Sequence, residues 1–467
     1  MAKVETVVFL SLVLDLFAFT IPLPLFPRLI EWYTKREISY PNGFLSRTLA
    51  FVSGVRSLLY KPSLHSQKWD VVLLGGLMGS VFSILQFLVS PRIGALSDRY
   101  GRKRILLITM IGNILSALVW VTSSTFASYM LSRVIGGLSE GNVQLAIAIL
   151  SDVTTPANRS KALAHVGIAF AICFCIGPPI GAYFASRPLP SINTFGIELN
   201  VYAMPALLTL VLLTVETLFL IFALPETRGK GLRGKNEDKN TTEKATNGAV
   251  KTARADTVQK RIELLNSLGF VHFLFLGVFS GVEFTLTFLT FDLFDWNNTQ
   301  NGKLIGSIGI ISALLQGGYV RRATSKIGEG VMARRGVLAC VLGLISLAIL
   351  PIYVDTNVVF ARRLLQLAAC CMAFTSATVV NSLTAFASLQ CDEGRFDPVT
   401  GKPAKEHPKL AKGKALGKFR SSGQLGRAIG PLIACASYWT FGPTYTYAVA
   451  GGAMLLLSIY MKKAVAV

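Results

Sequence analysis

The chain has 467 residues, of which 52% are hydrophobic and 15% are charged. Soluble domains carry about 25% charged residues, so this composition excludes an ordinary soluble protein and is typical of a protein with many membrane spans. The net charge of +21 gives no support for nucleic-acid binding, because the Lys and Arg residues lie mostly in loops between apolar runs and not in one basic domain.

Twelve apolar runs are each long enough to cross a bilayer, which takes about 20 residues in a helix. We place them at 5–29, 70–91, 104–123, 127–151, 161–184, 202–224, 265–291, 302–320, 334–353, 358–387, 414–438 and 444–461. The sequence therefore predicts an all-α membrane protein with twelve transmembrane helices. The first run lacks a basic leader and a cleavage site, so we expect it to remain as the first span.

Basic residues predict the orientation of these spans. Lys and Arg concentrate in the loops at 92–104, 159–161, 226–262, 321–335 and 390–414, which alternate with loops that hold few of them. Such an excess marks cytosolic loops, so both termini are predicted to be cytosolic. Counting the spans places the basic loop at 30–69 on the external side. This placement is compatible with its charge, because long loops can cross a membrane despite their basic residues. The plasma membrane and an endomembrane both remain open as its location.

A polar stretch at 226–262 divides the predicted spans into two sets of six. It is rich in Lys, Thr, Asn, Glu and Gly, a composition typical of a flexible cytosolic linker. We expect an N-terminal six-helix bundle at 1–225 and a C-terminal six-helix bundle at 263–467. Asn297 begins a glycosylation sequon in the external loop between the seventh and eighth spans, and its occupancy is left open.

The two predicted bundles repeat one another. Gly177-Pro178 follows Lys161-Ala162-Leu163 at the same separation at which Gly430-Pro431 follows Lys414-Ala415-Leu416. The spacing from Gly79-Ser80 to Gly101 likewise equals the spacing from Gly306-Ser307 to Gly328. Parallel repeats of this kind occur in transporters whose halves rock about a central substrate site. The two Gly-Pro pairs are predicted to kink their helices and let neighbours approach closely.

A short basic turn joins the second and third predicted spans at 94–104. Asp98 is its lone acid, among Arg99, Arg102, Lys103 and Arg104, and it can pair with one of them or with the positive end of a helix. Glycines permit a sharp reversal here. We predict a gating loop formed by Gly94, Asp98, Arg99, Gly101 and Arg102. The alternative is an ordinary basic membrane loop.

Three of the acids inside predicted spans are candidates for function, because an ionisable side chain there is costly unless it faces a cavity or a partner. They are Asp15, Glu140 and Glu283. Each can contact a substrate or carry a proton, because a carboxyl group away from water can take up a proton near neutral pH. Glu283 is the preferred proton carrier. A structural acid bonded to a neighbouring helix is the alternative for each.

Arginines inside the predicted spans supply the opposite charge. Arg420 and Arg427 are seven residues apart and share a helix face with Gln424 between them. Two permanent cations in a cavity favour an anionic substrate, although they could instead neutralise the buried acids. Arg133 stands seven residues before Glu140, two turns along the same face of an ideal helix, so the two are expected to couple through the cavity.

The basic turn at 94–104 resembles the signature loop of the major facilitator superfamily, G-x-L-[AS]-D-R-x-G-R-[RK]-x-x-L. It matches at Gly94, Leu96, Ser97, Asp98, Arg99, Gly101, Arg102, Lys103 and Leu106. The stretch 177–181 resembles the superfamily motif G-P-x-x-G, which is associated with antiporters. The stretches 6–16, 75–88 and 132–143 resemble the tetracycline-transporter-like branch, which includes drug:H⁺ antiporters and eukaryotic organic-anion transporters. The resemblance implies an alternating-access carrier, and it links Asp15 and Arg133 to substrate contact and proton coupling.

We therefore expect a secondary active transporter, coupled to protons, for an amphipathic organic anion or drug-like small molecule. It is expected to act as a monomer in the lipid bilayer. Two alternatives stay open: proton-coupled efflux of cationic or tetracycline-like drugs, and a non-transporting receptor or scaffold with a transporter fold. No enzyme motif is present, and none of the seven cysteines has zinc-ligand spacing with a histidine, so we expect no catalytic residue, cofactor or metal.

Overall fold

The computed structural model describes residues 3–22, 25–37, 43–59, 66–185, 203–228, 247–296, 298–391 and 407–464. Every regular element within these ranges is a helix. Ten of the described helices are long and apolar enough to cross a membrane. The 17-residue α1 adds one span, and α15 adds another because it turns back on itself at Gly442 (φ 83°, ψ 169°). The predicted all-α fold with twelve spans is confirmed.

The described helices fall into two successive sets. The first contains α1 (Val4–Thr20), α2 (Phe26–Arg36), α3 (Phe44–Leu59), α4 (Ser66–Tyr100), α5 (Arg102–Val121), α6 (Phe126–Ser139), α7 (Asn142–Val153), α8 (Pro156–Ala185) and α9 (Ala203–Ala223). The second contains α10 (Asn247–Phe294), α11 (Asn298–Leu315), the π-helix η2 (Gln316–Val320), α12 (Arg321–Ile327), α13 (Glu329–Tyr353), α14 (Val358–Leu389) and α15 (Lys412–Ala464).

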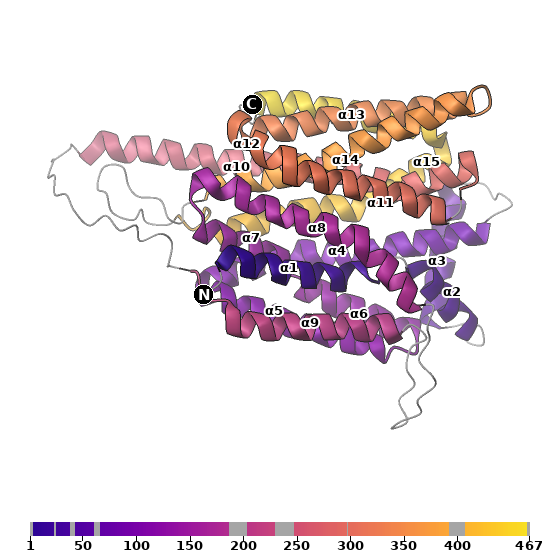
Figure 1. Ribbon diagram of the computed structural model, residues 1–467, viewed down its shortest axis with the longest axis horizontal. Coiled ribbons are helices and arrows are strands. Elements are labelled where there is room, and N and C mark those ends of the chain that lie inside the picture. The colour runs from indigo at the N-terminus through magenta and orange to yellow at the C-terminus, as the bar shows by residue number, and fades with distance from the viewer. Residues whose placement is uncertain are drawn as a thin grey trace.

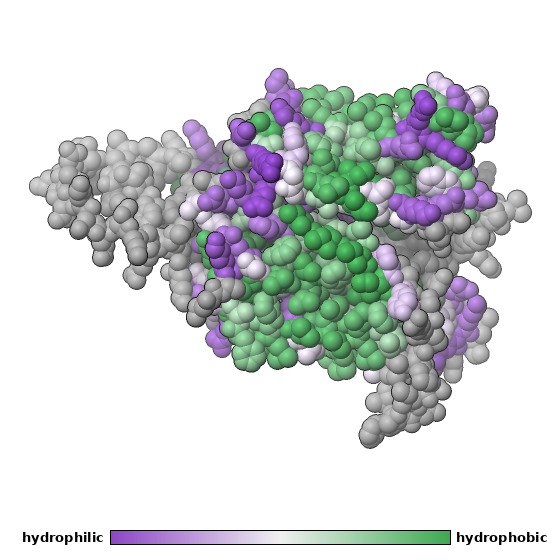
Figure 2. Space-filling view, in the orientation of Figure 1, coloured by the Kyte–Doolittle hydropathy of each residue, from purple (hydrophilic) through white to green (hydrophobic). Residues whose placement is uncertain are grey.

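The long helices run side by side along one direction (Figure 1). In this view α1, α5, α6 and α9 lie in the lower part of the molecule, and α11, α13 and α14 lie in the upper part. Both chain ends lie at the left, which we call the terminal end, and α2 and α3 lie at the opposite end. Hydrophobic residues cover the middle of this face and hydrophilic ones gather towards its two ends (Figure 2), as expected of a surface facing lipid.

The first span and the loop after it differ from the prediction. The span was expected to reach residue 29, but α1 ends at Thr20, close to Pro22, which has no N–H for a helical hydrogen bond. The region 30–69 was expected to be a loop, yet it contributes to α2 and α3. Tyr33 is fully buried and its hydroxyl donates to the Ser123 carbonyl oxygen at 3.2 Å. This bond fixes α2 to the turn between α5 and α6, and the Phe44 ring at the start of α3 stacks on the Phe126 ring of α6 at 5.9 Å.

The fourth span is interrupted where a continuous helix was predicted. α6 ends at Ser139 and α7 begins at Asn142, so Glu140 and Gly141 lie outside both helices. α6 continues from Arg133 to Ser139, so Glu140 directly follows the last helical residue, and Arg133 and Glu140 both line one pocket. Their coupling stays a prediction. The break places Asn142, the first residue of α7, inside the protein, where its side-chain amide donates to Asp15.

The predicted linker is partly helical. Residues 247–262 belong to α10, which continues without a break into the seventh span, and their alanine, lysine and arginine residues are strong helix formers. Residues 229–246 and the sequon residue Asn297 lie outside the described residues. The repeat is visible in the backbone, because Gly101 (φ 100°) and Gly328 (φ 86°) share one unusual conformation at equivalent turns. The bundle boundaries at 225 and 263 stay a prediction.

Candidate functional site

A cavity of about 320 Å³ lies between the two sets of helices. Its lining comes from α1, α4, α7 and α8 of the first set and from α10, α11, α14 and α15 of the second. Six of the predicted site residues line it: Asp15, Glu140, Glu283, Arg420, Gln424 and Arg427. Side chains from both halves therefore surround one space, which is the geometry that a rocking carrier needs.

Two arginines of α15 provide permanent positive charge in this cavity. Within the part of the chain that the structure describes, neither Arg420 nor Arg427 makes an ion pair within 4.0 Å or a hydrogen bond to another side chain. Their nearest electrostatic counterparts are acids across the space, Glu140 and Asp15 for Arg420 and Glu283 for Arg427. Both guanidinium groups are thus available to an anion that enters the cavity.

The three acids have different surroundings. Asp15 is held in place, because the Asn142 side-chain amide donates to its Oδ1 at 2.6 Å and Thr109 in turn donates to Asn142 at 3.1 Å. Glu140 and Glu283 make no hydrogen bond to any residue in the described ranges. Glu283 lines the cavity on α10, and Glu140 lies at the break between α6 and α7. Asp15 is therefore fixed, while the other two carboxyl groups are free to change partner.

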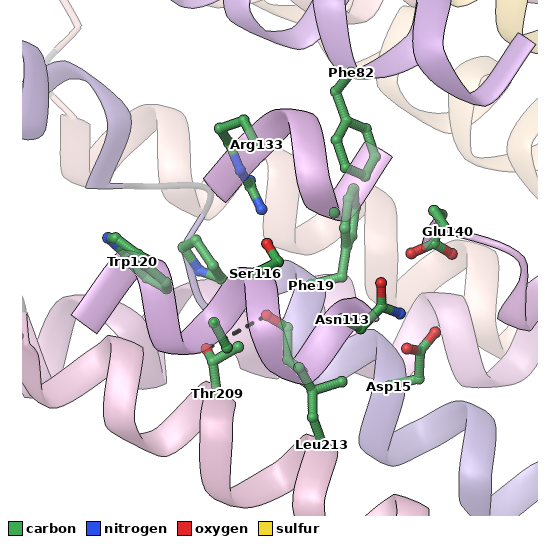
Figure 3. Close-up of a pocket in the computed structure, with 14 residues that line it drawn as sticks. Asp15, Phe19, Phe82, Asn113, Ser116, Trp120, Arg133, Glu140, Thr209 and Leu213 are labelled. Carbon is green, nitrogen blue, oxygen red and sulfur yellow. Dashed lines mark hydrogen bonds between the residues drawn. The ribbon is translucent and has the colours of Figure 1, made fainter. Parts of the chain in front are cut away.

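Arg133 faces a smaller pocket of about 50 Å³ inside the first set of helices (Figure 3). Asn113, Ser116, Trp120 and Thr209 also line it. This side pocket and the central cavity share four lining residues, Asp15, Phe19, Phe82 and Glu140. A polar space of this size can hold a few water molecules. Arg133 is thus placed behind the acids and not in the central cavity.

The Arg133 guanidinium is held by an aromatic ring. Its central carbon lies 5.4 Å from the centroid of the Phe82 ring, a distance typical of a cation–π interaction. In Figure 3 the rings of Phe19 and Phe82 stand between Arg133 and Glu140. The coupling that the sequence predicted for these two charges would therefore have to act past the rings, by charge and not by direct contact.

At the terminal end, Arg102 forms the centre of a buried ionic cluster. Its side chain is 0% exposed and donates to Asp98 at 2.6 Å, to Ser97 at 2.7 Å and to Asp152 at 3.1 Å. The Lys412 ammonium also reaches Asp152, at 3.1 Å. Because Lys412 belongs to α15 and the other four residues to the first set of helices, this cluster joins the two halves.

Asp98 makes the second connection between the halves. Its two carboxylate oxygens accept the backbone N–H groups of Gly413 at 2.8 Å and of Lys414 at 2.7 Å. These N–H groups open α15, so the carboxylate caps that helix and meets its positive end. Gly94 allows the approach, since a Cβ there would collide with the Gly413 carbonyl oxygen. Of the predicted gating loop, only Arg99 points away: it is exposed and lies over the Tyr100 ring.

Sequence reasoning missed three members of this region, namely Asp152, Glu226 and Lys412. The Glu226 carboxylate accepts the backbone N–H groups of Arg102 at 2.9 Å and Lys103 at 3.1 Å, and so caps α5. Each missed residue lies within two residues of the end of a predicted span, on the side where the basic turn was predicted. Opposite charges at the ends of neighbouring spans were the signal that could have found them.

The Gly-Pro pairs occupy equivalent close contacts in the two halves. A Cβ on Gly177 would collide with the Thr20 hydroxyl of α1, and one on Gly430 would collide with the Gly277 carbonyl oxygen of α10. Pro178 and Pro431 both lie within helices that continue past them, α8 and α15. The glycines thus set helix spacing beside the cavity, as small residues do in membrane bundles.

The chain is similar in sequence to known membrane proteins. Residues 8–397 match the model of the Major Facilitator Superfamily. Major facilitator superfamily domain-containing protein 10 of Homo sapiens is 34% identical over 461 residues, 99% of this chain and 93% of that protein. The Mus musculus protein of the same name is 32% identical over 97% of this chain and 91% of its own. The class B tetracycline resistance protein of Escherichia coli is 24% identical over 58% of this chain and 62% of its own.

Solved structures give the same result. The crystal structure described as the human organic anion transporter MFSD10 (TETRAN) superposes with a TM-score of 0.77 at 31% identity and covers 98% of both chains. The proton:xylose symporter XylE superposes with a TM-score of 0.63 at 14% identity, covering 98% of this chain and 94% of its own. At that identity the second comparison shows the fold alone.

Proposed function

The chain belongs to the major facilitator superfamily, and from that premise we propose that it carries an amphipathic organic anion across the membrane together with protons. It is a multi-pass membrane transporter and not an enzyme. The observation that carries the proposal is the pair Arg420 and Arg427, which face the central cavity without a carboxylate within 4.0 Å among the described residues. Support also comes from the human relative whose structure is described as an organic anion transporter.

The charges of the cavity favour coupling between the anion and the proton. Each proton taken up by Asp15, Glu140 or Glu283 removes a negative charge that faces the arginines. The arginines then attract an anion more strongly, and the bound anion in turn favours the protonated acids, because such coupling is reciprocal. A cationic substrate would compete with the proton for the same acids. We therefore expect the anion and the proton to move in the same direction.

The arrangement in the membrane completes the proposal. Two bundles, at 1–225 and 263–467, rock about the central cavity, with both termini and the linker on the cytosolic side. The cluster around Asp98 and Arg102 closes the cytosolic end, and release of that cluster opens the cavity to the cytosol. The protein works as a monomer, as transporters of this superfamily typically do.

The proposal is tested with purified protein in liposomes and two probes that share one ring system. 2-Naphthalenesulfonate keeps its negative charge at every pH used, and (2-naphthylmethyl)trimethylammonium keeps its positive charge. We expect saturable uptake of the sulfonate, accelerated by an acidic outer buffer, and no saturable uptake of the ammonium. Uptake of the ammonium alone would support a cation carrier, and uptake of neither would support a receptor or scaffold.

Arg427→Ala should weaken sulfonate transport, because it removes one of two cations that would contact the anion. A hydrogen bond to a charged group contributes about 1.5–3 kcal/mol, so KM should rise at least tenfold. Arg363→Ala is the matched control, since Arg363 is an exposed arginine of α14 outside the cavity. Equal KM values for Arg427→Ala and wild type would count against an anion site at α15.

Glu283→Gln should remove the acceleration of sulfonate uptake by an acidic outer buffer, because glutamine keeps the shape of the side chain and cannot take up a proton. Asp355→Asn is the control, since Asp355 is an exposed acid outside the cavity. Uptake is measured at a series of outer pH values. An unchanged pH dependence in Glu283→Gln would exclude this residue as the proton carrier.

A further inference from the structure

One part of the cavity wall carries neutral amides and no arginine. Gln316 of η2 and Asn381 of α14 both line the central cavity. Gln316 is only 4% exposed, and its Oε1 atom has no hydrogen-bond partner among the residues that the structure describes. A buried amide oxygen without a partner is unfavourable. It is therefore a marker of a ligand group that would supply the missing hydrogen bond.

The two amides meet at a glycine of the opposite half. A Cβ on Gly167 of α8 would collide with both Asn381 Nδ2 and Gln316 Oε1. Both amide groups therefore approach the α8 backbone closely, across the boundary between the halves. Only a residue without a side chain leaves this room. Gly167, Gln316 and Asn381 together form what we call the amide subsite.

The backbone of the eighth span changes its winding at this point. Gln316 is the first residue of η2, and the Arg321 N–H donates to the Gln316 carbonyl oxygen, five residues back. Short π-helical segments inside membrane and soluble helices occur frequently at functional sites. The wider turn starts at the residue whose side chain enters the cavity.

We propose that the amide subsite binds a neutral hydroxyl or amide group of the transported anion. An amide side chain offers both a donor and an acceptor, and a hydroxyl group can satisfy both at once. The inference rests on the proposed function, because the same molecule would place its negative charge at Arg420 and Arg427. The substrate class is then narrower than organic anions in general: it is an anion that also carries a hydrogen-bonding neutral group.

The subsite makes a specificity prediction of a definite sign. A site whose buried polar groups pair with a substrate hydroxyl rejects the analogue that lacks it, because those groups would stay unpaired. The cavity should prefer 6-hydroxy-2-naphthalenesulfonate to 2-naphthalenesulfonate, although the added hydroxyl makes the first molecule the more costly one to take out of water. A purely apolar wall would show the reverse preference.

The test compares uptake of these two sulfonates by the full chain in liposomes. We expect wild type to show a kcat/KM at least fivefold higher for the hydroxylated probe. Gln316→Leu and Asn381→Leu should each bring that ratio close to one, and an unchanged size-exclusion profile and circular-dichroism spectrum of each purified variant give the evidence of folding. Thr384→Val is the control: Thr384 lines the same wall, but its hydroxyl already donates to the Val380 carbonyl oxygen at 2.7 Å.

Each result decides a different statement. If wild type transports both probes equally well, or if both leucine variants keep the preference, the amide subsite is overturned and the anion carrier stands. If wild type transports neither probe, the proposed function fails, and the subsite fails with it. A preference lost in the two leucine variants and kept in Thr384→Val supports the subsite.

Discussion

Two turns of the molecule have the same backbone and different chemistry. Gly101 joins α4 to α5 with φ 100°, and Gly328 joins α12 to α13 with φ 86°. The residue after Gly101 is Arg102, which is fully buried in the ionic cluster. The residue after Gly328 is Glu329, of opposite charge. The repeat has kept the glycine at both turns and the arginine at one.

The two turns show that the reversal of the chain and the contact between the halves depend on different residues. A reversal at positive φ requires glycine in either half. The connection between the halves requires Asp98 in addition, and the residue at the equivalent spacing in the second half is Ser325. Arg321 and Arg322, beside the second turn, are exposed. The connection between the halves at the terminal end, which we call the seal, is therefore made by residues of the first turn, while Arg321 and Arg322 at the second turn face outward.

Replacement of Arg102 should have the largest effect. Arg102→Ala leaves Asp98 and Asp152 buried without their common cation, which costs about 3–5 kcal/mol when one partner of a buried pair is removed. Lys326→Ala, beside the second turn, should change stability by less than about 0.5 kcal/mol, because Lys326 is exposed and surface substitutions usually have effects of that size. Melting temperatures of the purified variants in one detergent give the measurement. Equal melting temperatures would show that the two turns contribute equally to the free energy of unfolding.

Removal of the Asp98 charge should open the seal and leave the fold intact. Asp98→Asn keeps the size of the side chain, but only one of its terminal atoms can accept the N–H groups that open α15. We expect a shift towards the state that is open at the terminal end and a fall in transport of about tenfold. Ser325→Asn, at the equivalent spacing in the second half, is the matched control.

Cys391 reports on this shift. It lies just beyond α14 at the terminal end and is 2% exposed, and burial raises the pKa of its thiol to about 12. The thiolate is the reactive form, so alkylation near pH 7.5 should be very slow in the closed state. Opening restores solvent and lowers that pKa, so Asp98→Asn should accelerate alkylation at Cys391, measured by mass spectrometry of the peptide. An unchanged rate would mean that Asp98 does not hold this end closed.

The sequence predicted the parts of the site that depend on a single helix or a short motif. Spans, basic turn and repeat followed from local patterns, and Asp15, Glu283, Arg420 and Arg427 were recognisable because charge inside an apolar run is costly. Their arrangement around one cavity depends on which helices pack together. The pattern of apolar residues in a single sequence does not reveal that packing. For this reason Asp152 and Lys412, which are distant in sequence and adjacent in space, were missed.

The interruption at Glu140 could not be predicted for a related physical reason. The run 127–151 is predominantly apolar and contains no proline, so its length and composition favour one membrane helix. The break is stabilised by tertiary contacts: the Asn142 side chain, at the start of α7, is bonded to Asp15 and Thr109 from two other helices. Similarly, α2 and α3 form because Tyr33 and its neighbours find an apolar surface on α5 and α6.

The smallest difference between the two turns is expected when their glycines, Gly101 and Gly328, are each replaced by alanine. Alanine at either turn must adopt a backbone conformation that only glycine populates readily, at a cost of about 1–3 kcal/mol. At Gly328 the new methyl group would enter open space, but at Gly101 it would collide with the Glu226 carboxylate that caps α5. Gly101→Ala should therefore lower the melting temperature more than Gly328→Ala. Equal losses would mean that Glu226 moves aside at no cost. In that case the cap on α5 would add nothing to the seal, and the difference between the turns would rest on Asp98 and Arg102 alone.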